Sequence, residues 1–191
     1  MNVVSLFSGA GGFDLGLMQA GHNIIWANDV DEDSCTTYRN NIGDHIVCGD
    51  IARIDLSDIP ESDVVIGGFP CQGFSLANML RSPDDSRNGL YIYFRRIVKA
   101  KQPSYFLAEN VRGLLSLDKG RVMKQVVKDF SSAGYRVKYQ VFNMANYGVP
   151  QSRIRVIIAG TRQDLPKECD FQFPEQTHDE STWISIGEAL K

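Results

Sequence analysis

The stretch VVIGGFPCQGFS, at residues 64–75, is the most informative part of the sequence. Its first three apolar residues predict a buried strand, and the glycine pair Gly67–Gly68 ends that strand. Pro70 and Cys71 follow, so the thiol is expected at the carboxyl edge of a sheet, where open α/β sheets bind ligands. A buried cysteine is usually a small core residue, but the neighbouring glycines and proline favour an exposed turn. We therefore interpret Cys71 as a nucleophile.

Length and composition fit one globular domain. The chain has 191 residues, of which 43% are hydrophobic and 23% charged, enough for an α/β domain with its own core. We expect a single catalytic and cofactor-binding domain over residues 1–191, with a core at 1–160 and a C-terminal extension at 161–191. The sequence has no apolar stretch long enough to span a bilayer and no signal-peptide pattern, so we expect a cytoplasmic protein without a membrane partner.

Cysteine spacing and the distribution of charge exclude some functional classes of protein. The four cysteines form no C-x-x-C pair and the three histidines do not cluster, so we expect no metal site, no disulfide framework and reduced thiols. The net charge of −3 argues weakly against a free-standing nucleic-acid binder. Residues 29–63 carry ten acids and two bases, whereas residues 102–162 carry three acids and ten bases. The second half is therefore able to present a basic face to phosphates.

Strands and helices alternate along the chain at the spacing of βαβ units. We expect strands at 3–7, 23–27, 46–48, 64–66 and 105–108, and helices at 13–20, 32–40, 90–100, 119–133 and 183–190. The two last strands, 136–142 and 153–158, have no helix between them and are expected to form an antiparallel edge hairpin. The predicted fold class is α/β, with a doubly wound, mainly parallel sheet. Polar residues at 76–88 predict a long loop.

The glycine-rich turn FSGAGG, at residues 7–12, lies between a predicted strand and a predicted helix. Glycines allow the backbone to approach a ligand closely, but Asp14 stands where the dinucleotide fingerprint needs its third glycine. Asp29 ends the second strand, where a carboxylate can accept both hydroxyls of a ribose. Its alternative role, as a helix N-cap, is assigned instead to Asp31 or Asp33. Asp50 follows the third strand and either meets an adenine amino group or has a structural role.

Three elements, that of Cys71 included, are expected to end at the same sheet edge and to bring different chemical groups to it. Glu109 follows the fifth strand, and the strand opened by QSRIR at residues 151–155 carries Arg153 and Arg155 on one face. A thiol, a carboxyl and two guanidiniums can together attack a ring carbon, protonate a ring nitrogen and hold a carbonyl oxygen. Glu109 is alternatively a structural ion-pair partner of either arginine. The combination favours a catalytic site.

Together these stretches resemble the DNA cytosine-5 methyltransferases, and most closely those of bacterial restriction–modification systems. The matching stretches are FSGAGGF at 7–13, GFPCQGFS at 68–75, ENV at 109–111 and QSRIR at 151–155. The resemblance covers roughly residues 1–160. It implies a Rossmann-like methyltransferase of the bacterial cytoplasm that uses S-adenosylmethionine, leaves S-adenosylhomocysteine and acts on double-stranded DNA.

The resemblance also implies roles for individual residues. Cys71 adds to cytosine C6, Glu109 protonates N3, and Arg155 holds O2 with support from Arg153. The cofactor is held by Phe7, Gly9, Gly11, Gly12, Asp29, Val30, Asp50, Ile51, Pro70 and Leu90. DNA is contacted by Gln72, Ser75 and Arg81. The target base leaves the helix, and the loop at 76–88 is expected to cover it.

Members of the family continue, after the QSRIR-like strand, with a target-recognition domain and a final motif. This chain ends at Lys191 without either. We expect the catalytic subunit of a split enzyme, whose second subunit carries the recognition domain and the final motifs; a truncated chain and a natural remnant are the alternatives. For function, the alternatives are the tRNA-methylating branch of the family and a non-catalytic module with the cofactor fold. A nicotinamide oxidoreductase is less favoured, because Asp14 interrupts the dinucleotide fingerprint and such an enzyme would give Cys71 no role.

Overall fold

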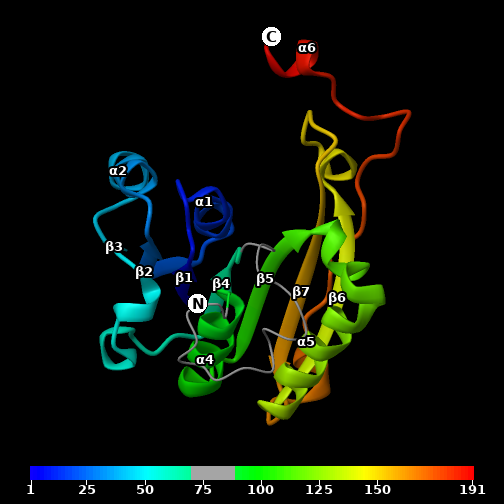
Figure 1. The fold of residues 1–191 in the computed structure, drawn as a ribbon. Helices are drawn as coiled ribbons and strands as arrows, with labels where there is room; N and C mark the ends of the chain where they lie inside the picture. Colours follow the sequence, from blue (N-terminus) through cyan, green and yellow to red (C-terminus); the bar gives the residue numbers. More distant parts are fainter. Residues whose placement is uncertain (70–88) are drawn as a thin grey trace.

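A seven-stranded sheet forms the centre of the computed structural model, which describes residues 1–69 and 89–191 (Figure 1). The strand order is β3-β2-β1-β4-β5-β7-β6. Strands β1 to β5 run parallel, and β7 runs antiparallel to both β5 and β6. The predictions for Pro70, Cys71, Gln72, Ser75 and Arg81, and for the loop at 76–88, lie outside the described residues.

The elements follow one another in α/β order along the chain. The strands are β1 Asn2–Leu6, β2 Asn23–Asp29, β3 Ile46–Cys48, β4 Val64–Gly67, β5 Tyr105–Val111, β6 Tyr135–Asn143 and β7 Ile154–Arg162. The helices are α1 Gly12–Gln19, α2 Glu32–Asn41, α4 Tyr91–Lys101, α5 Arg121–Ser132 and α6 Ile186–Ala189. Short 3-10 turns are η1 Ile51–Arg53, η2 Leu56–Asp58, η3 Arg112–Leu115, η4 Leu117–Gly120, η5 Met144–Tyr147 and η6 Lys167–Cys169. None of the helices within the described ranges is long and apolar enough to cross a membrane.

The larger part of the core lies between the sheet and the helices α4 and α5. Phe106 of β5 packs on Phe130 of α5, with 4.2 Å between ring centroids, and Phe94 of α4 completes the aromatic cluster. Each of these rings is fully buried, and such burial stabilises the fold by roughly 1.5–3 kcal/mol per side chain. Gly160 of β7 makes room for this cluster, since a Cβ there would lie 1.9 Å from Phe106 Cε1.

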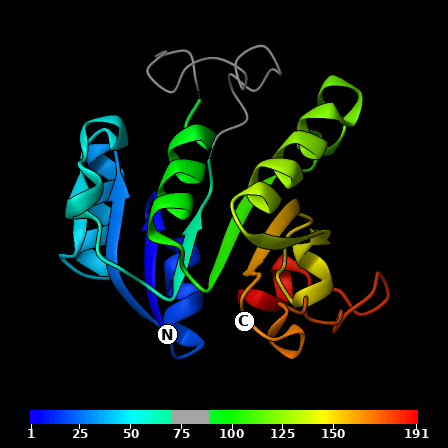
Figure 2. The ribbon, with the colours of Figure 1, turned by 90° about the horizontal axis from the view of Figure 1, so that it is seen from below.

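The other face of the sheet is covered by α1, so helices lie on both faces, as a doubly wound sheet requires (Figure 2). Phe13 and Leu17 of α1 pack against a buried cluster of Val3, Ile24, Val64 and Ile66. The predicted fold class, a mainly parallel doubly wound sheet with an antiparallel edge hairpin, is confirmed.

Several predicted boundaries differ from those of the structure. α5 begins at Arg121 rather than 119, because Asp118, Lys119 and Gly120 have left-handed φ angles of 50°, 55° and 79°. β7 begins at Ile154, so Arg153 precedes the strand that was expected to contain it. The helix expected over 183–190 forms only over Ile186–Ala189, where Ser185 and Glu188 make a capping box.

Candidate active site

Three charged side chains meet where β5 ends and β7 begins. Val111 is paired with Arg155 and Glu109 with Ile157, so Glu109 and Arg155 are diagonal neighbours on one face of the antiparallel pair. Arg155 Nε lies 2.6 Å from Glu109 Oε1, and Arg153 Nη2 lies 3.8 Å from the same oxygen. The structure therefore brings together the three described residues that the sequence predicted to be catalytic.

This cluster has more positive than negative charge. One carboxyl group faces two guanidiniums, so the cluster at the carboxyl end of β5 is positively charged. Arg155 is the more constrained arginine, because its Nη1 also donates to the Ile154 carbonyl at 2.9 Å and its side chain is 21% exposed. Arg153 is 49% exposed. An excess guanidinium of this kind suits a carbonyl oxygen or another electron-rich group.

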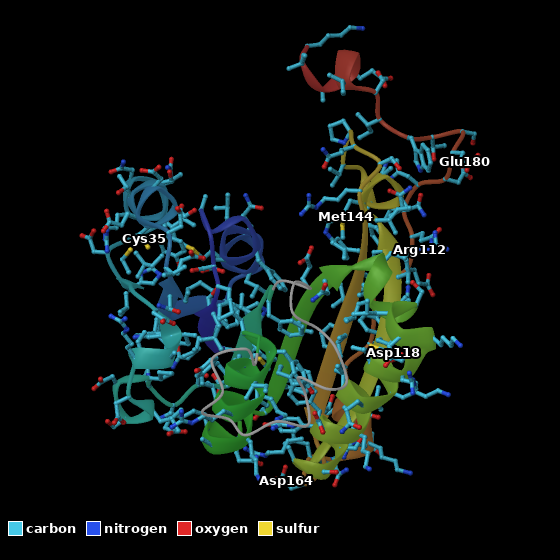
Figure 3. All side chains as sticks on the ribbon, in the orientation of Figure 1. Cys35, Arg112, Asp118, Met144, Asp164 and Glu180 are labelled. Carbon is cyan, nitrogen blue, oxygen red and sulfur yellow. The ribbon has the colours of Figure 1, made fainter. Side chains whose placement is uncertain are left out.

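A cavity of about 590 Å³ separates the charged cluster from the glycine-rich turn. Its lining brings together the residues Ser5, Leu6, Phe7, Ser8, Gly12, Phe13, Asp14, Gly67, Gly68, Glu109, Met144, Arg153, Arg155 and Ile157. Figure 3 shows Met144 beside the end of the β6–β7 hairpin, toward the opposite edge of the sheet from Cys35. The cavity is large enough for a heterocycle, since ligand pockets typically have volumes of about 300–1,000 Å³.

Asn110 links the charged cluster to the stretch that leads to Cys71. Its buried side chain donates from Nδ2 to the Phe69 carbonyl at 2.8 Å and accepts from the Val111 amide at 2.9 Å. Gly68 lies close by, because a Cβ there would be 3.4 Å from Glu109 Oε2. Asn110 thus fixes the backbone at the last described residue before Pro70. Sequence reasoning assigned Asn110 no role beyond its place in a motif, although a polar residue that directly follows Glu109 at a strand end is a usable signal.

The glycine-rich turn is held in left-handed conformations. Phe7, Gly9 and Gly11 have φ angles of 55°, 54° and 87°, and for Phe7 this region is strained. A Cβ at Gly11 would lie 2.1 Å from Ile42 Cδ1, so this glycine allows α2 to pack on the turn. A Cβ at Gly9 or at Gly12 would meet nothing within 4 Å. Gly9 and Gly12 therefore leave open space beside the turn.

A second cavity, of about 280 Å³, lies beside the turn and contains most of the predicted cofactor residues. Its lining comprises Phe7, Asn28, Asp29, Val30, Gly49, Asp50, Ile51, Gly68 and Leu90. Six of the ten residues predicted to hold the cofactor are among them, and Gly12 lines the first cavity. Phe7 and Gly68 line both cavities, so the two spaces share a wall.

Backbone amides hold the two carboxylates of the second cavity. Asp29 accepts from the Gly9 amide at 2.7 Å and from the Asp31 amide at 3.0 Å. Asp50 accepts from the Ala52 amide at 3.0 Å and caps η1. Asp31, one of the two predicted candidates, caps α2 through the Ser34 amide at 2.8 Å. Asp29 therefore has a structural contact that the sequence did not reveal, and its oxygens still have lone pairs for a ligand.

These residues fit a nucleoside. The side chains of Phe7, Val30, Ile51 and Leu90 offer apolar surface to a base, while carboxylates accept hydrogen bonds from ribose hydroxyls and from an exocyclic amine. Within residues 1–69 and 89–191, no three His, Cys, Asp or Glu side chains are grouped to hold a metal ion.

Asp14 is a buried acid that the sequence did not identify as part of the site. It is fully buried and lines the larger cavity, and it accepts from Ser5 Oγ and from the Tyr38 hydroxyl, each at 2.7 Å. Burial raises the pKa of Asp14, and the two hydrogen bonds partly oppose this rise. Burial also raises the pKa of Tyr38, whose hydroxyl lies 3.0 Å from His45 Nε2. The sequence signal for this residue was an acid at the position where the dinucleotide fingerprint has its third glycine.

Comparison with known proteins places the chain in an enzyme family. A family model described as "C-5 cytosine-specific DNA methylase" matches residues 1–189. The type II methyltransferase M.NgoFVII of Neisseria gonorrhoeae is 45% identical over 98% of this chain and 52% of its own length. M.BsuRI of Bacillus subtilis, also a type II methyltransferase, is 37% identical over 100% of this chain and 50% of its own length. The chain thus spans about half the length of the curated relatives it matches.

Solved structures give the same fold. A putative DNA modification methyltransferase encoded within a prophage of E. coli superimposes with a TM-score of 0.77 at 30% identity, over 100% of this chain and 54% of that chain. The Dnmt2 methyltransferase of S. pombe superimposes with a TM-score of 0.66 at 19% identity, over 87% of this chain and 51% of that chain, and shows likeness of fold alone.

Proposed function

The chain belongs to the C-5 cytosine-specific DNA methylase family, and from this premise we propose that it transfers a methyl group from S-adenosylmethionine to C5 of a cytosine in double-stranded DNA. One observation carries the proposal for this particular chain. The cluster of Glu109, Arg153 and Arg155 lines a cavity that shares Phe7 and Gly68 with the nucleoside-sized cavity beside the glycine-rich turn. A methyl donor and a pyrimidine can therefore be held side by side.

The second cavity is the proposed cofactor site. Asp29 takes the ribose hydroxyls and Asp50 the adenine amino group, while Phe7, Val30, Ile51 and Leu90 contact the base. Gly9 and Gly12 face open space, which leaves room for the methionine part next to the turn. When bound, S-adenosylmethionine would supply an electrophilic methyl group, and S-adenosylhomocysteine would remain once that group is transferred to C5. Gly11 and Pro70 complete the proposed set; Gly11 acts through packing against α2, and Pro70 is proposed from the sequence.

Activation of the cytosine is assigned to Cys71 and Glu109. The Cys71 thiolate forms a bond to C6, Glu109 gives a proton to N3, and the electrons of the C5–C6 double bond make C5 nucleophilic. Arg155 holds the O2 oxygen as charge moves toward the ring, an electrostatic role that preorganised donors perform well. Arg153, whose Nη2 lies 3.8 Å from Glu109 Oε1, supports this arrangement.

Release of the product reverses the addition. A base removes the C5 proton, the C5–C6 double bond forms again, and the bond to the Cys71 sulfur breaks so that the thiolate leaves. Glu109 takes back the N3 proton and is ready for another cycle. The target cytosine has to leave the duplex to reach the cavity, which costs a few kcal/mol in unstacking. Gln72, Ser75 and Arg81 are the proposed contacts to DNA around it.

Replacement of Cys71 tests the mechanism. Cys71→Ser is expected to abolish tritiated-methyl transfer to duplex DNA, because a serine hydroxyl is a far poorer nucleophile at neutral pH. Calorimetric titration with S-adenosylmethionine serves as the control and is expected to give wild-type affinity. Substantial turnover by the serine variant would remove Cys71 from the mechanism.

Duplex DNA is favoured over tRNA as the substrate. Support comes from relatives that are named type II methyltransferases and are 45% and 37% identical to this chain. Parallel methylation assays on duplex DNA and on tRNA separate the two substrates, and methylation of tRNA alone would refute the DNA assignment. Cofactor binding without turnover on either substrate would favour a non-catalytic module.

Target recognition is proposed to come from a second subunit. Support comes from the coverage of the relatives, of which the chain spans about half. The bacterial source of these relatives and the proposed DNA substrate support the bacterial cytoplasm as the proposed compartment. Co-expression with the product of the neighbouring open reading frame tests the split arrangement: we expect a gain in activity or solubility, and no gain would count against a partner.

A further inference from the structure

A surface of unusual charge follows the candidate site along the chain. Residues 112–128 contain five bases and one acid, whereas the whole chain has a net charge of −3. All five bases are exposed. They are Arg112 in η3, Lys119 in η4, and Arg121, Lys124 and Lys128 in α5, and together they are named the basic ridge.

Helix geometry directs the ridge away from the core. Arg121, Lys124 and Lys128 are three and four residues apart, so they lie on one stripe of α5. The opposite stripe carries the buried side chains Val122 and Val126. Packing of α5 on the sheet therefore holds the three cations in a row that faces solvent.

The charges of the ridge are largely uncompensated. Within the part of the chain that the structure describes, Arg121 forms an ion pair with Asp118, and the other four cations form none. Several arginines elsewhere are paired, for example Arg136 with Asp170 at 2.6 Å. Like charges one helical turn apart destabilise a helix by roughly 0.2–0.5 kcal/mol per pair. Among the described residues, Asp118 is the one acid that forms an ion pair with the ridge, which leaves room for an external anion.

The ridge also lies next to the proposed chemistry. Arg112 directly follows Val111, whose backbone is paired with Arg155. Figure 2 shows α5 standing out from the sheet at the end where the helix begins. Figure 3 places Arg112 and Asp118 on the side of the molecule away from α1 and α2, the helices of the acid-rich first third of the chain.

We propose that the basic ridge binds the phosphate backbone of the duplex whose cytosine is methylated. The inference rests on the proposed function, because it takes double-stranded DNA as the substrate. The stripe from Arg121 to Lys128 is about 10 Å long at ~1.5 Å per residue, which matches about three phosphates of one strand at ~3.4 Å of helix axis each. Such contacts fix the position of the protein on the duplex without reading its sequence.

The experiment compares two triple variants that remove the same amount of charge. Lys119→Gln, Lys124→Gln and Lys128→Gln together remove three ridge cations. Arg96→Gln, Lys99→Gln and Lys167→Gln remove three exposed cations from other surfaces. Fluorescence anisotropy measures binding of each full chain, saturated with S-adenosylmethionine, to one labelled duplex over a series of salt concentrations.

The ridge variant is expected to bind duplex more than tenfold more weakly than wild type at low salt. The slope of log affinity against log salt is expected to become shallower by about 2–3, at ~0.9 for each phosphate that is no longer neutralised. The control variant keeps the wild-type slope. Unchanged thermal unfolding and unchanged calorimetric affinity for S-adenosylmethionine establish that the ridge variant is folded.

The experiment gives one set of results if the ridge proposal is wrong and another if the proposed function is wrong. Three results would refute the ridge proposal, even where methyl transfer proceeds. They are a wild-type slope in the ridge variant, an equal loss of affinity in the control variant, and no binding of the wild-type chain to duplex at low salt. Binding of the wild-type chain to tRNA but not to duplex would also overturn it. A wild-type chain that shows the expected slopes but never methylates DNA would instead refute the proposed function.

Discussion

The two sides of the candidate site hold their charged groups in different ways. On the side of the parallel strands, the carboxylates of Asp29 and Asp50 are held by backbone amides. On the side of the antiparallel pair β5–β7, Glu109 is held by the side chains of Arg155 and Arg153. The first arrangement is fixed by the fold, whereas the second consists of groups that are able to exchange partners.

This difference matches the two proposed tasks. A cofactor that is bound in the same way in every cycle is served by acceptors whose positions are set by the backbone. A group that gains and loses a proton needs a carboxyl and a guanidinium whose interaction changes during the reaction. Substitutions on the two sides are therefore expected to affect different measurements, catalysis on the side of Glu109 and cofactor binding on the side of Asp29.

Among substitutions that distinguish the two sides, the largest effect is expected from Glu109→Gln. Glutamine keeps an oxygen that can accept from Arg155 Nε, which lies 2.6 Å from Glu109 Oε1, but it has no carboxyl proton to give to N3. Methyl transfer to duplex DNA is expected to fall by about 10²–10⁴, the usual contribution of general acid–base catalysis. Single-turnover assays with tritiated cofactor measure this loss.

The matched control for that prediction is cofactor affinity. Glu109 is absent from the lining of the smaller cavity, so calorimetry is expected to give Glu109→Gln the wild-type affinity for S-adenosylmethionine. A rate loss smaller than about tenfold, or a parallel loss of cofactor affinity, would contradict the division of tasks between the two sides.

Much of the fold was predictable from the sequence because hydrophobic runs and glycine stops are local signals. Val64 to Ile66, followed by Gly67, forms β4 as expected, and the missing helix between the last strands correctly predicted their antiparallel pairing. Helix ends were less predictable. The left-handed turn at Asp118 and Lys119 delays α5 until Arg121, although such a conformation is costly for residues other than glycine.

The sequence predicted which described side chains lie near one another, but not their hydrogen bonds. Strand order places Glu109 and Arg155 on one face, which follows from motif positions at two strand ends. The contact between Asp29 and the Gly9 amide joins residues twenty positions apart, and only the folded backbone reveals it. Asp14 was overlooked for the same reason, since its partner Tyr38 belongs to another helix.

An intermediate effect is expected from Asp29→Asn on the side held by the backbone. The asparagine oxygen can replace only one of the two acceptors that bind the amides of Gly9 and Asp31, and the amide nitrogen then faces an N–H donor. The proposed hydrogen bond from a ribose hydroxyl to the charged carboxylate is worth roughly 1.5–3 kcal/mol, so its loss is expected to lower the calorimetric affinity for S-adenosylmethionine by about 10–150-fold.

Asp50→Asn is the matched control for Asp29→Asn. Asp50 accepts from the backbone amide of Ala52 through one oxygen, so the asparagine oxygen can keep that contact and a smaller loss of affinity is expected. Equal losses in the two variants would show that the backbone contacts of Asp29 do not matter for the cofactor.

The smallest effect concerns Asp14, a buried acid that lines the larger cavity. Its pKa is raised above the ordinary value of 3.8, chiefly by burial, so ionisation of this carboxyl costs stability in the folded chain. The hydrogen bonds from Ser5 and Tyr38 reduce that cost, as does positive charge on His45. The contribution of Asp14 to stability is therefore complete below pH 3.8 and is lost as pH rises through its folded-state pKa.

Asp14→Asn removes this titration. Urea unfolding of both proteins over a pH series gives the free energy of unfolding of each. The difference in favour of wild type is expected to be largest at acid pH. That advantage then declines with rising pH, by about 1.4 kcal/mol for each unit by which the pKa is raised. A difference that stays constant with pH would show that Asp14 ionises as an exposed carboxyl does. The side held by backbone amides would then gain no stability from a buried acid. Its contrast with the side of Glu109 would depend on Asp29 and Asp50.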